Sequence, residues 1–203
     1  MKRYFITGIG TDVGKTFAAA ILVEALQADY WKPIQAGNLG NTDTMKIRSL
    51  VSNAQSQFYP ETYRLSKPMS PHAAAVADGI QIDRANLILP DTSNTLIIEG
   101  AGGLMVPLNN RFLVIDLIEQ FKAEVILVSR NYLGSINHTL LSVAALNNKN
   151  IPIRGIIFNG NSTSSTEEYI LNYTGLKCLL RIDEENNINK ATILKYKAQL
   201  ACE

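Results

Sequence analysis

The sequence has little of what several large protein classes depend on. It contains two cysteines, Cys178 and Cys202, and neither belongs to a CxxC pair, so zinc binding and thiol redox chemistry are unsupported. We expect Cys202, the penultimate residue, to be frayed and without a role. No apolar run approaches the ~20 residues of a membrane span, and a strand pattern at the N-terminus stands where a signal peptide would be. We therefore predict a cytoplasmic protein that does not enter a membrane.

The charge is balanced, which argues against nucleic acid as a partner. Nineteen basic and 18 acidic residues give a net charge of +1, and neither a basic patch nor an acidic tail stands out. The length of 203 residues and a hydrophobic content of 46% suit one globular unit. We therefore expect residues 1–203 to form a single domain.

Strand-like apolar runs alternate with helical patterns along the chain. This alternation predicts an α/β fold: an open, mostly parallel sheet with helices on both faces, in three layers, as in P-loop NTPases. Strands are expected at 3–7, 30–32, 95–99, 125–128, 153–158 and 176–180. Helices are expected at 15–28, from about 43, and at 71–77, 83–89, 135–146 and 190–200. We expect segment 53–70 to be a connection with little regular structure, and Ile136, Leu140, Leu141 and Ala144 to form the apolar face of the helix at 135–146.

A nucleotide phosphate-binding loop is the strongest signal in the chain. Gly8 to Thr16 follows the apolar run at 4–6 and ends in Gly-Lys-Thr at the start of a helix. Backbone N–H groups and the positive end of the helix would face an anion there. Lys15 would neutralise phosphate charge and Thr16 would offer its hydroxyl to Mg²⁺. Ile9 stands where the strict motif has glycine, and a glycine-rich turn without a ligand is the alternative.

Polar residues at the ends of other strands predict a magnesium site. Ligands bind beyond the carboxyl ends of the strands in open α/β sheets, and Glu99 ends a run of aliphatic residues there. Thr16, Glu99 and Asp43 together would supply the oxygen ligands that Mg²⁺ prefers. The alternatives are a helix N-cap or an exposed strand end for Glu99 and a helix N-cap for Asp43.

Two further features lie near the same strand ends. Gly100 to Gly103 has the pattern of a second glycine-rich turn, which would either let a substrate approach the backbone closely or serve only as a flexible turn. Lys32 follows a short strand and precedes a proline, so it could neutralise a developing phosphate or carboxylate charge. The alternative for Lys32 is an ordinary surface lysine.

Several blocks, taken in this order, resemble the dethiobiotin synthetase family. They are Thr7-Gly8…Thr11-Asp12-Val13-Gly14-Lys15-Thr16, Lys32-Pro33-Ile34-Gln35-Ala36-Gly37, Ser70-Pro71-His72, Glu99-Gly100-Ala101-Gly102-Gly103 and Leu133-Gly134-Ser135-Ile136-Asn137-His138-Thr139. Asn159, after a strand, resembles the family's adenine-contacting asparagine. The chain departs from the family pattern at Ile9-Gly10 and at Ala36, where a hydroxyl residue is common.

The resemblance implies an ATP- and Mg²⁺-dependent ligase. Diaminopelargonic acid and CO₂ (from bicarbonate) would form a carbamate, the carbamate would attack the γ-phosphate of ATP, and the second amine would close the ring with loss of phosphate. Lys32, Lys15 and Thr11 would be the catalytic residues. ATP would be bound by Asp12, Val13, Gly14, Lys15, Thr16, Glu99 and Asn159, and Mg²⁺ by Thr16, Asp43 and Glu99. The substrate would meet Lys32, Gly102, Gly103, Gly134, Ser135, Ile136 and Asn137.

Members of the family are homodimers in which the neighbouring subunit binds the far end of the substrate, and the resemblance implies the same arrangement for this chain. The turn at 134–137 opens a helix, so its N–H groups could receive a substrate carboxylate. An ATP-driven dimeric switch of the partitioning or metal-cluster-delivery type is the alternative function. Such switches usually carry an extra lysine early in the phosphate loop, and residues 8–13 contain none.

Overall fold

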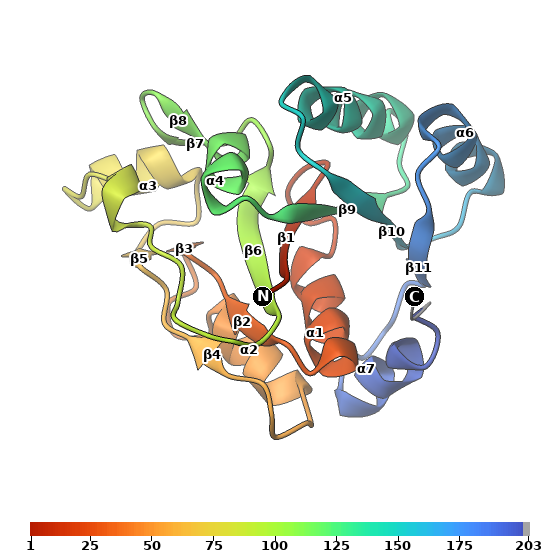
Figure 1. Ribbon diagram of the computed structural model, residues 1–203, viewed down its shortest axis with the longest axis horizontal. Coiled ribbons are helices and arrows are strands. Elements are labelled where there is room, and N and C mark those ends of the chain that lie inside the picture. The colour runs from red at the N-terminus through yellow and green to blue at the C-terminus, as the bar shows by residue number, and fades with distance from the viewer. Residues whose placement is uncertain (201–203) are drawn as a thin grey trace.

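A central parallel sheet organises the chain. The computed structural model describes residues 1–200, so the expectation for Cys202 lies outside the described residues. Within them, a seven-stranded sheet has the order β11-β10-β9-β1-β6-β2-β4, and every neighbouring pair is parallel (Figure 1). The strands are β1 (Arg3–Gly8), β2 (Asp29–Trp31), β4 (Phe58–Tyr59), β6 (Leu96–Gly103), β9 (Glu124–Arg130), β10 (Ile153–Asn159) and β11 (Cys178–Ile182).

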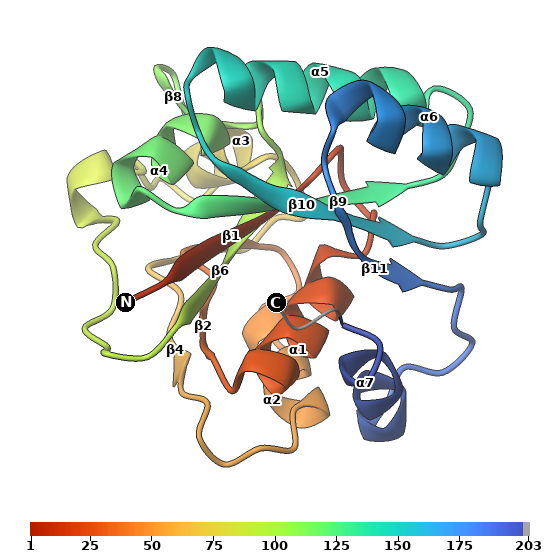
Figure 2. The ribbon, with the colours of Figure 1, turned by 45° about the vertical axis from the view of Figure 1, so that its right-hand side comes forward.

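Helices cover both faces of this sheet, which confirms the three-layer prediction. Figure 2 shows α1 (Lys15–Leu26), α2 (Asp43–Leu50) and α7 (Lys190–Lys197) on one face. The opposite face carries α3 (Pro71–Ala77), α4 (Val114–Phe121), α5 (Ser135–Asn148) and α6 (Ser164–Thr174). Alternate residues of the strands enter two separate apolar cores: Ile98 packs with one core and Ile97 with the other, as the period of two requires.

The chain crosses between the two halves of the sheet at β1. The connection through α1 leads from β1 to β2 on one side, and the chain later passes from β6 to β9 on the other side of β1. A crevice forms at such a point beyond the carboxyl ends of the strands. The loop after β1, the residues after β2 and the last part of β6 therefore meet at one place.

Segment 53–70 has little regular structure, as expected, and holds only two short strands, β4 and β5 (Tyr63–Leu65); β5 pairs with β3 (Ile34–Ala36). One expected element is wrong. Segment 83–89 forms only a 3₁₀ turn, Arg84–Asn86, capped by Asp83. The sequence patterns did not reveal α4, α6 or the hairpin of β7 (Pro107–Asn109) and β8 (Phe112–Leu113). Strands this short carry no readable alternation.

The expected glycine-rich turn at 100–103 is also wrong, because β6 continues through it. Gly8 pairs with Gly103 across the sheet. A Cβ on Gly100 would lie 2.7 Å from Cε1 of Phe5, which is closer than real Cβ contacts. The glycines thus let two strands and a core ring pack closely, and they bring the backbone of β6 to the edge of the crevice.

The apolar face expected for α5 is only partly right: Ile136 packs against the core and Leu140 is partly buried, but Leu141 and Ala144 are exposed. Leu141 is 60% exposed, whereas Ser135 and Thr139 are buried with Val143 and Leu146. The Thr139 hydroxyl donates to the carbonyl of Ser135 at 2.7 Å and lies 3.0 Å from Oγ of Ser129 on β9. Because these hydroxyls find partners, polar residues can face the sheet.

Among residues 1–200, no helix combines the length and apolar character needed to cross a bilayer.

The buried carboxylate of Glu24 links α1, the end of α2 and α7, near the end of α1 that lies away from the crevice. Glu24 on α1 is 2% exposed. Its Oε2 accepts the backbone N–H groups of Ser52 and Asn53, just after α2, at 2.7 and 3.1 Å. Its Oε1 lies 3.3 Å from Nζ of Lys197 on α7. Although burial disfavours the charge, these hydrogen bonds hold the pKa of Glu24 below its ordinary value of 4.5.

We expect Glu24→Ala to destabilise the protein by about 1–3 kcal/mol, because two N–H groups lose their acceptor. Since the pKa is lowered on folding, the stabilisation is present above about pH 4.5 and is lost as the pH falls through the folded value. Urea unfolding of wild type and variant at several pH values measures this difference. The exposed Glu168→Gln is the control. A stability gap that stays constant down to pH 3 would contradict the role given to the charge.

Candidate active site

The phosphate-binding loop is a tight connection between β1 and α1. Gly14 has φ of 94° and precedes a helix with no side-chain cap, so the first N–H groups of α1 are available to an anion. A Cβ on Gly14 would lie 2.2 Å from Nδ2 of Asn159. Asn159 in turn donates to the carbonyl of Val13 at 2.9 Å. Asn159 therefore supports the loop from the end of β10.

Ile9, the departure from the strict motif, has a packing role. Its backbone N–H donates to the carbonyl of Val128 at 3.1 Å, and its side chain packs against both apolar cores. A Cβ added to Gly10 would have no neighbour within 4 Å. The loop is thus anchored at Ile9 and has open space beside Gly10.

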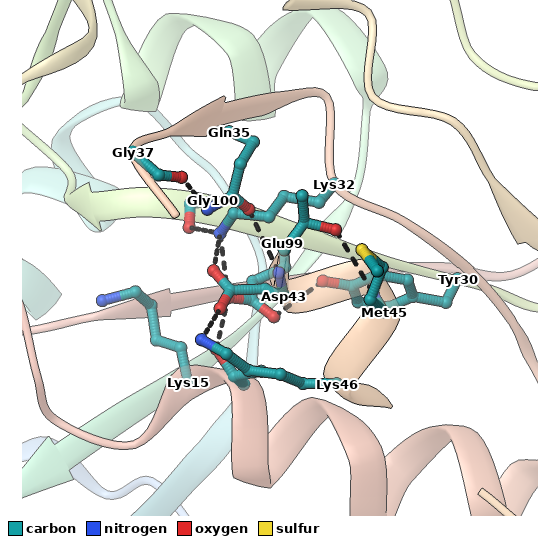
Figure 3. A network of polar contacts seen from close by, with 12 residues as sticks. Lys15, Tyr30, Lys32, Gln35, Gly37, Asp43, Met45, Lys46, Glu99 and Gly100 are labelled. Carbon is teal, nitrogen blue, oxygen red and sulfur yellow. Dashed lines mark hydrogen bonds and ion pairs between the residues drawn. The ribbon is translucent and has the colours of Figure 1, made fainter. Parts of the chain in front are cut away.

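Glu99 is the centre of a polar cluster at the floor of the crevice (Figure 3). It is 1% exposed and belongs to the middle of β6, so it is neither an N-cap nor an exposed strand end. Its Oε1 accepts from Oγ1 of Thr16 and from Nζ of Lys32, both at 2.9 Å. Its Oε2 accepts from the hydroxyl of Tyr30 at 2.9 Å. Three elements therefore converge on one carboxylate.

Asp43 brings a second carboxylate to the same lysine. It is the first residue of α2, and the helix is capped by Thr42, whose side chain accepts from the N–H of Met45. The N-cap alternative for Asp43 is therefore wrong. Its Oδ2 lies 3.2 Å from Nζ of Lys32 and its Oδ1 lies 3.0 Å from Nζ of Lys46. One lysine thus joins Glu99 and Asp43.

The charges of the cluster are mutually stabilised. Burial disfavours the ammonium of Lys32, but Glu99 and Asp43 more than offset this and raise its pKa. Burial likewise opposes the charge of Asp43, and Lys32 with Lys46 lowers the pKa of that carboxyl. Burial raises the pKa of Tyr30 well above its usual value. The surface-lysine alternative for Lys32 is excluded, since Lys32 is 5% exposed.

Lys15 differs from Lys32 because its charge has weaker compensation. It is 8% exposed, and its Nζ donates to the carbonyl of Gly10 at 2.8 Å. Burial lowers its pKa to about 8. A triphosphate held by the loop would supply the negative charge that this lysine lacks. The free protein thus carries a buried cation turned back onto its own loop.

These side chains line one cleft of about 940 Å³. Nine of the sequence-predicted site residues lie along it, namely Thr11, Asp12, Gly14, Lys15, Thr16, Lys32, Asp43, Glu99 and Gly102. Val13 is buried, and Asn159 lies against the loop. Gly103 pairs with Gly8 in the sheet. Ala36, Ser70 and Pro71 also line the cleft, in agreement with the sequence blocks that contain them.

The turn at 134–137 lies elsewhere. Gly134, Ser135, Ile136 and Asn137 line a second hollow of about 650 Å³, together with residues 131–133, Thr163 and Thr166. Leu133, at the edge of this hollow, is fully exposed. The fold of one chain therefore does not bring this turn to Lys32.

Three residues of the polar cluster and the cleft were not predicted as part of the site. The fully buried Tyr30 contacts Glu99 from beneath the cleft, and Lys46, which lines the cleft, contacts Asp43. Gln35 accepts from the N–H of Asp43 at 3.2 Å and donates to the carbonyl of Gly37 at 3.0 Å, which links β3 to the start of α2. Tyr30 stands directly before Trp31-Lys32 in the sequence, but no motif marks it as part of the site.

The oxygen atoms at the floor of the cleft fit Mg²⁺. In the part of the chain that is described, no group of three His, Cys, Asp or Glu side chains is arranged for a metal. Two carboxylates and the Thr16 hydroxyl do converge, and both carboxylates share the positive charge of Lys32. Mg²⁺ is held by one or two carboxylates with water and substrate phosphates. This sparse set of hard oxygen ligands matches that chemistry.

The chain is similar in sequence to proteins that are already known. Residues 2–192 match a family model described as an AAA domain. The chain is 54% identical over 201 residues to the ATP-dependent dethiobiotin synthetase of Cytophaga hutchinsonii, covering 98% of this chain and 97% of that protein. It is 53% identical over 195 residues to the corresponding synthetase of Christiangramia forsetii, covering 96% of this chain and 94% of that one.

Solved structures of similar fold are more distant in sequence. A ParA family ATPase from Chlorobium tepidum matches with a TM-score of 0.59 at 15% identity, over 98% of this chain and 91% of that chain. MinD from Pyrococcus horikoshii, complexed with Mg-ADP, matches with a TM-score of 0.57 at 13% identity, over 98% and 95%. At such identities the likeness shows the P-loop NTPase-like fold alone.

Proposed function

The chain belongs to the family of ATP-dependent dethiobiotin synthetases, ligases of biotin biosynthesis that use ATP with Mg²⁺, and we propose which of its residues act on which substrates. The observation that carries the proposal is the cluster of Thr16, Lys32, Asp43 and Glu99 beside the phosphate-binding loop. The cleft combines anion-binding N–H groups, two buried lysines and a cation site. Among residues 1–200, no cysteine takes part in it.

The proposed reaction joins diaminopelargonic acid with CO₂. One amine adds to CO₂ and loses a proton, which gives a carbamate. A carbamate oxygen attacks the γ-phosphorus, the bond to the β,γ-bridging oxygen breaks, and ADP leaves. The second amine then attacks the carbamate carbon, expels phosphate and loses a proton, which closes the ring of dethiobiotin. Negative charge accumulates throughout, so positioned cations stabilise the reacting groups.

Lys15 and the phosphate-binding loop hold the triphosphate. The unsatisfied N–H groups at the start of α1 receive phosphate oxygens, and Thr11 with Asp12 lines the approach. Lys15 would exchange its contact with the Gly10 carbonyl for a phosphate oxygen. Thr16, Asp43 and Glu99 would hold Mg²⁺, which when bound neutralises phosphate charge. Asn159 keeps the loop in shape through its bond to Val13.

Lys32 would bind the carbamate and the transferred phosphoryl group. Its ammonium lies at the floor of the cleft, 3.4 Å from the carbonyl of Gly100, and Gly102 lines the same cleft. Because Glu99 and Asp43 keep it charged, Lys32 can stabilise the developing anion without gaining or losing a proton. No side chain is required as a nucleophile.

We propose that a second copy of the chain completes the substrate site. The turn at 134–137 lies outside the cleft of its own subunit. The N–H groups at the start of the 14-residue helix α5 would receive the substrate carboxylate. Exposed apolar side chains border both hollows, Met69 beside the cleft and Leu133 beside the turn. A homodimer that pairs the two hollows would cover them. The reaction would take place in the cytoplasm, where ATP is available.

Mixing two defective variants tests this arrangement. Lys32→Ala disables the cleft, and Asn137→Asp places a negative charge where the substrate carboxylate would bind. After subunit exchange, one of the two sites in each mixed dimer combines the intact cleft of one subunit with the intact turn of the other. We expect roughly a quarter of the wild-type activity at low diamine concentration. Each variant incubated alone is the control. A mixture no more active than its two parts would contradict a site shared between subunits.

A further inference from the structure

The two carboxylates at the floor of the cleft use their oxygens unequally. Glu99 presents Oε1 to Thr16 and Lys32, while Oε2 is held by Tyr30 at 2.9 Å. Asp43 presents Oδ2 to Lys32 at 3.2 Å, while Oδ1 is held by Lys46 at 3.0 Å. In each carboxylate, one oxygen contacts the ammonium of Lys32 and the other is bound by a second residue, Tyr30 for Glu99 and Lys46 for Asp43 (Figure 3).

Tyr30 is fixed in this position by its surroundings. It lies on β2, next to β6, and none of its surface is exposed. Its ring packs against Phe58, with 6.2 Å between the ring centres. A rigid aromatic side chain buried in this way has little freedom to turn. Its hydroxyl therefore fixes the rotation of the Glu99 carboxylate.

Carboxylate geometry separates Mg²⁺ from larger cations. Mg²⁺ requires near-octahedral geometry and short bonds, which suit one oxygen from each carboxylate. Ca²⁺ accepts six to eight oxygens at longer distances and readily takes both oxygens of one carboxylate. A hydrogen-bond donor on the second oxygen thus disfavours the ligand geometry that Ca²⁺ uses.

We propose that Tyr30 and Lys46 are positioning residues that make Glu99 and Asp43 each offer a single oxygen, and thereby select Mg²⁺ over Ca²⁺ for the bound nucleotide. This inference rests on the metal site of the proposed function. It assigns roles to two residues outside the sequence blocks that identify the family. Tyr30 acts from the sheet and Lys46 from α2, so the two can be tested separately.

Nucleotide binding, measured without turnover, tests the proposal. A non-hydrolysable ATP analogue is titrated into the full-length protein by calorimetry, with Mg²⁺ or with Ca²⁺, and the ratio of the two affinities is compared among variants. We expect Tyr30→Phe to weaken Mg²⁺-dependent binding about tenfold, as outer-shell changes at metal sites do, and to weaken Ca²⁺-dependent binding less. Lys46→Met should likewise reduce the ratio of Mg²⁺-dependent to Ca²⁺-dependent nucleotide affinity.

A tyrosine on the neighbouring strand β4 provides the matched control. The hydroxyl of Tyr59 lies 3.2 Å from Oδ2 of Asp29, at the start of β2. Tyr59→Phe removes an equivalent bond to a carboxylate outside the cleft and should leave the Mg²⁺/Ca²⁺ ratio unchanged. If Tyr30→Phe does not fold, Lys46→Met decides the question, because Lys46 is partly exposed.

The outcomes are distinct. A ratio that narrows in Tyr30→Phe or Lys46→Met, and not in Tyr59→Phe, supports the proposal. The proposal is overturned if the ratio of Mg²⁺-dependent to Ca²⁺-dependent nucleotide affinity is unchanged in folded Tyr30→Phe and Lys46→Met, including the case in which both affinities fall equally. That outcome leaves the proposed function intact. Wild-type nucleotide binding that does not respond to Mg²⁺ would instead overturn the metal site, and this inference with it.

Discussion

Lys32→Ala should lose turnover by about a hundredfold to a thousandfold while keeping nucleotide affinity within a few-fold of wild type. Lys32 lies beyond the phosphate-binding loop, at the position proposed for the carbamate and the transferred phosphoryl group. The partners of its ammonium are Glu99, Asp43 and the Gly100 carbonyl, which belong to β6 and α2 rather than to the loop. The loss should therefore appear in kcat and only weakly in nucleotide binding.

The same substitution should change how the protein responds to Mg²⁺. Without Lys32, the buried carboxylate of Glu99 keeps only the hydroxyls of Thr16 and Tyr30, and the half-buried Asp43 keeps only Lys46. Breaking a buried ion pair costs about 3–5 kcal/mol. A bound divalent cation would replace the missing charge. We expect Mg²⁺ to raise the Tm of Lys32→Ala more than that of wild type.

Steady-state kinetics, calorimetric titration of nucleotide and thermal unfolding with and without Mg²⁺ check these expectations. The exposed Lys2→Ala, at the opposite end of β1, is the control for a lost lysine. Full turnover in Lys32→Ala would exclude the role proposed for its ammonium. If the Tm of Lys32→Ala does not change with Mg²⁺, no cation binds between the two carboxylates.

Lys15→Ala should weaken nucleotide binding about a hundredfold and abolish turnover. A charge-assisted hydrogen bond is worth about 1.5–3 kcal/mol, and each 1.4 kcal/mol is a factor of ten in affinity. In the free protein the ammonium is buried and donates to the backbone carbonyl of Gly10. Most of its electrostatic stabilisation would therefore come with the phosphates.

Titration of ADP and of an ATP analogue into Lys15→Ala, Lys32→Ala and Lys2→Ala separates the two roles. Lys15→Ala should lose affinity for both nucleotides, and Lys32→Ala should keep it. Equal loss of nucleotide binding in Lys15→Ala and Lys32→Ala would contradict the separate roles given to these lysines.

The sequence predicts the site best where chain order determines position. Residues that end parallel strands meet at one edge of the sheet, so Glu99 could be grouped with the phosphate-binding loop and Thr16. Asp43 starts α2, and its place in the site was supported mainly by the family resemblance. The phosphate-binding loop follows from its glycines and from Gly-Lys-Thr at a strand-to-helix boundary. The layers of the fold follow from the alternation of patterns.

The remaining features depend on side-chain contacts between distant segments. The bond from Tyr30 to Glu99 requires β2 and β6 to be neighbours in a particular register, which a single sequence does not reveal. The error in the face predicted for α5 has a similar cause, since Thr139 faces the sheet with its hydroxyl bound by the Ser135 carbonyl and by Ser129 on β9. The glycines at 100–103 suggested a turn, although close packing against Phe5 and Gly8 keeps them in a strand.

Product formation tests the proposed ligase most directly. The purified protein is incubated with ATP, Mg²⁺, bicarbonate and diaminopelargonic acid, each component is omitted in turn, and dethiobiotin is measured by mass spectrometry. We expect product that requires all four components and ATP consumption that depends on the diamine. If no product forms and ATP is hydrolysed slowly at a rate that does not depend on the diamine, the proposed ligase activity is contradicted and an ATP-driven switch is favoured.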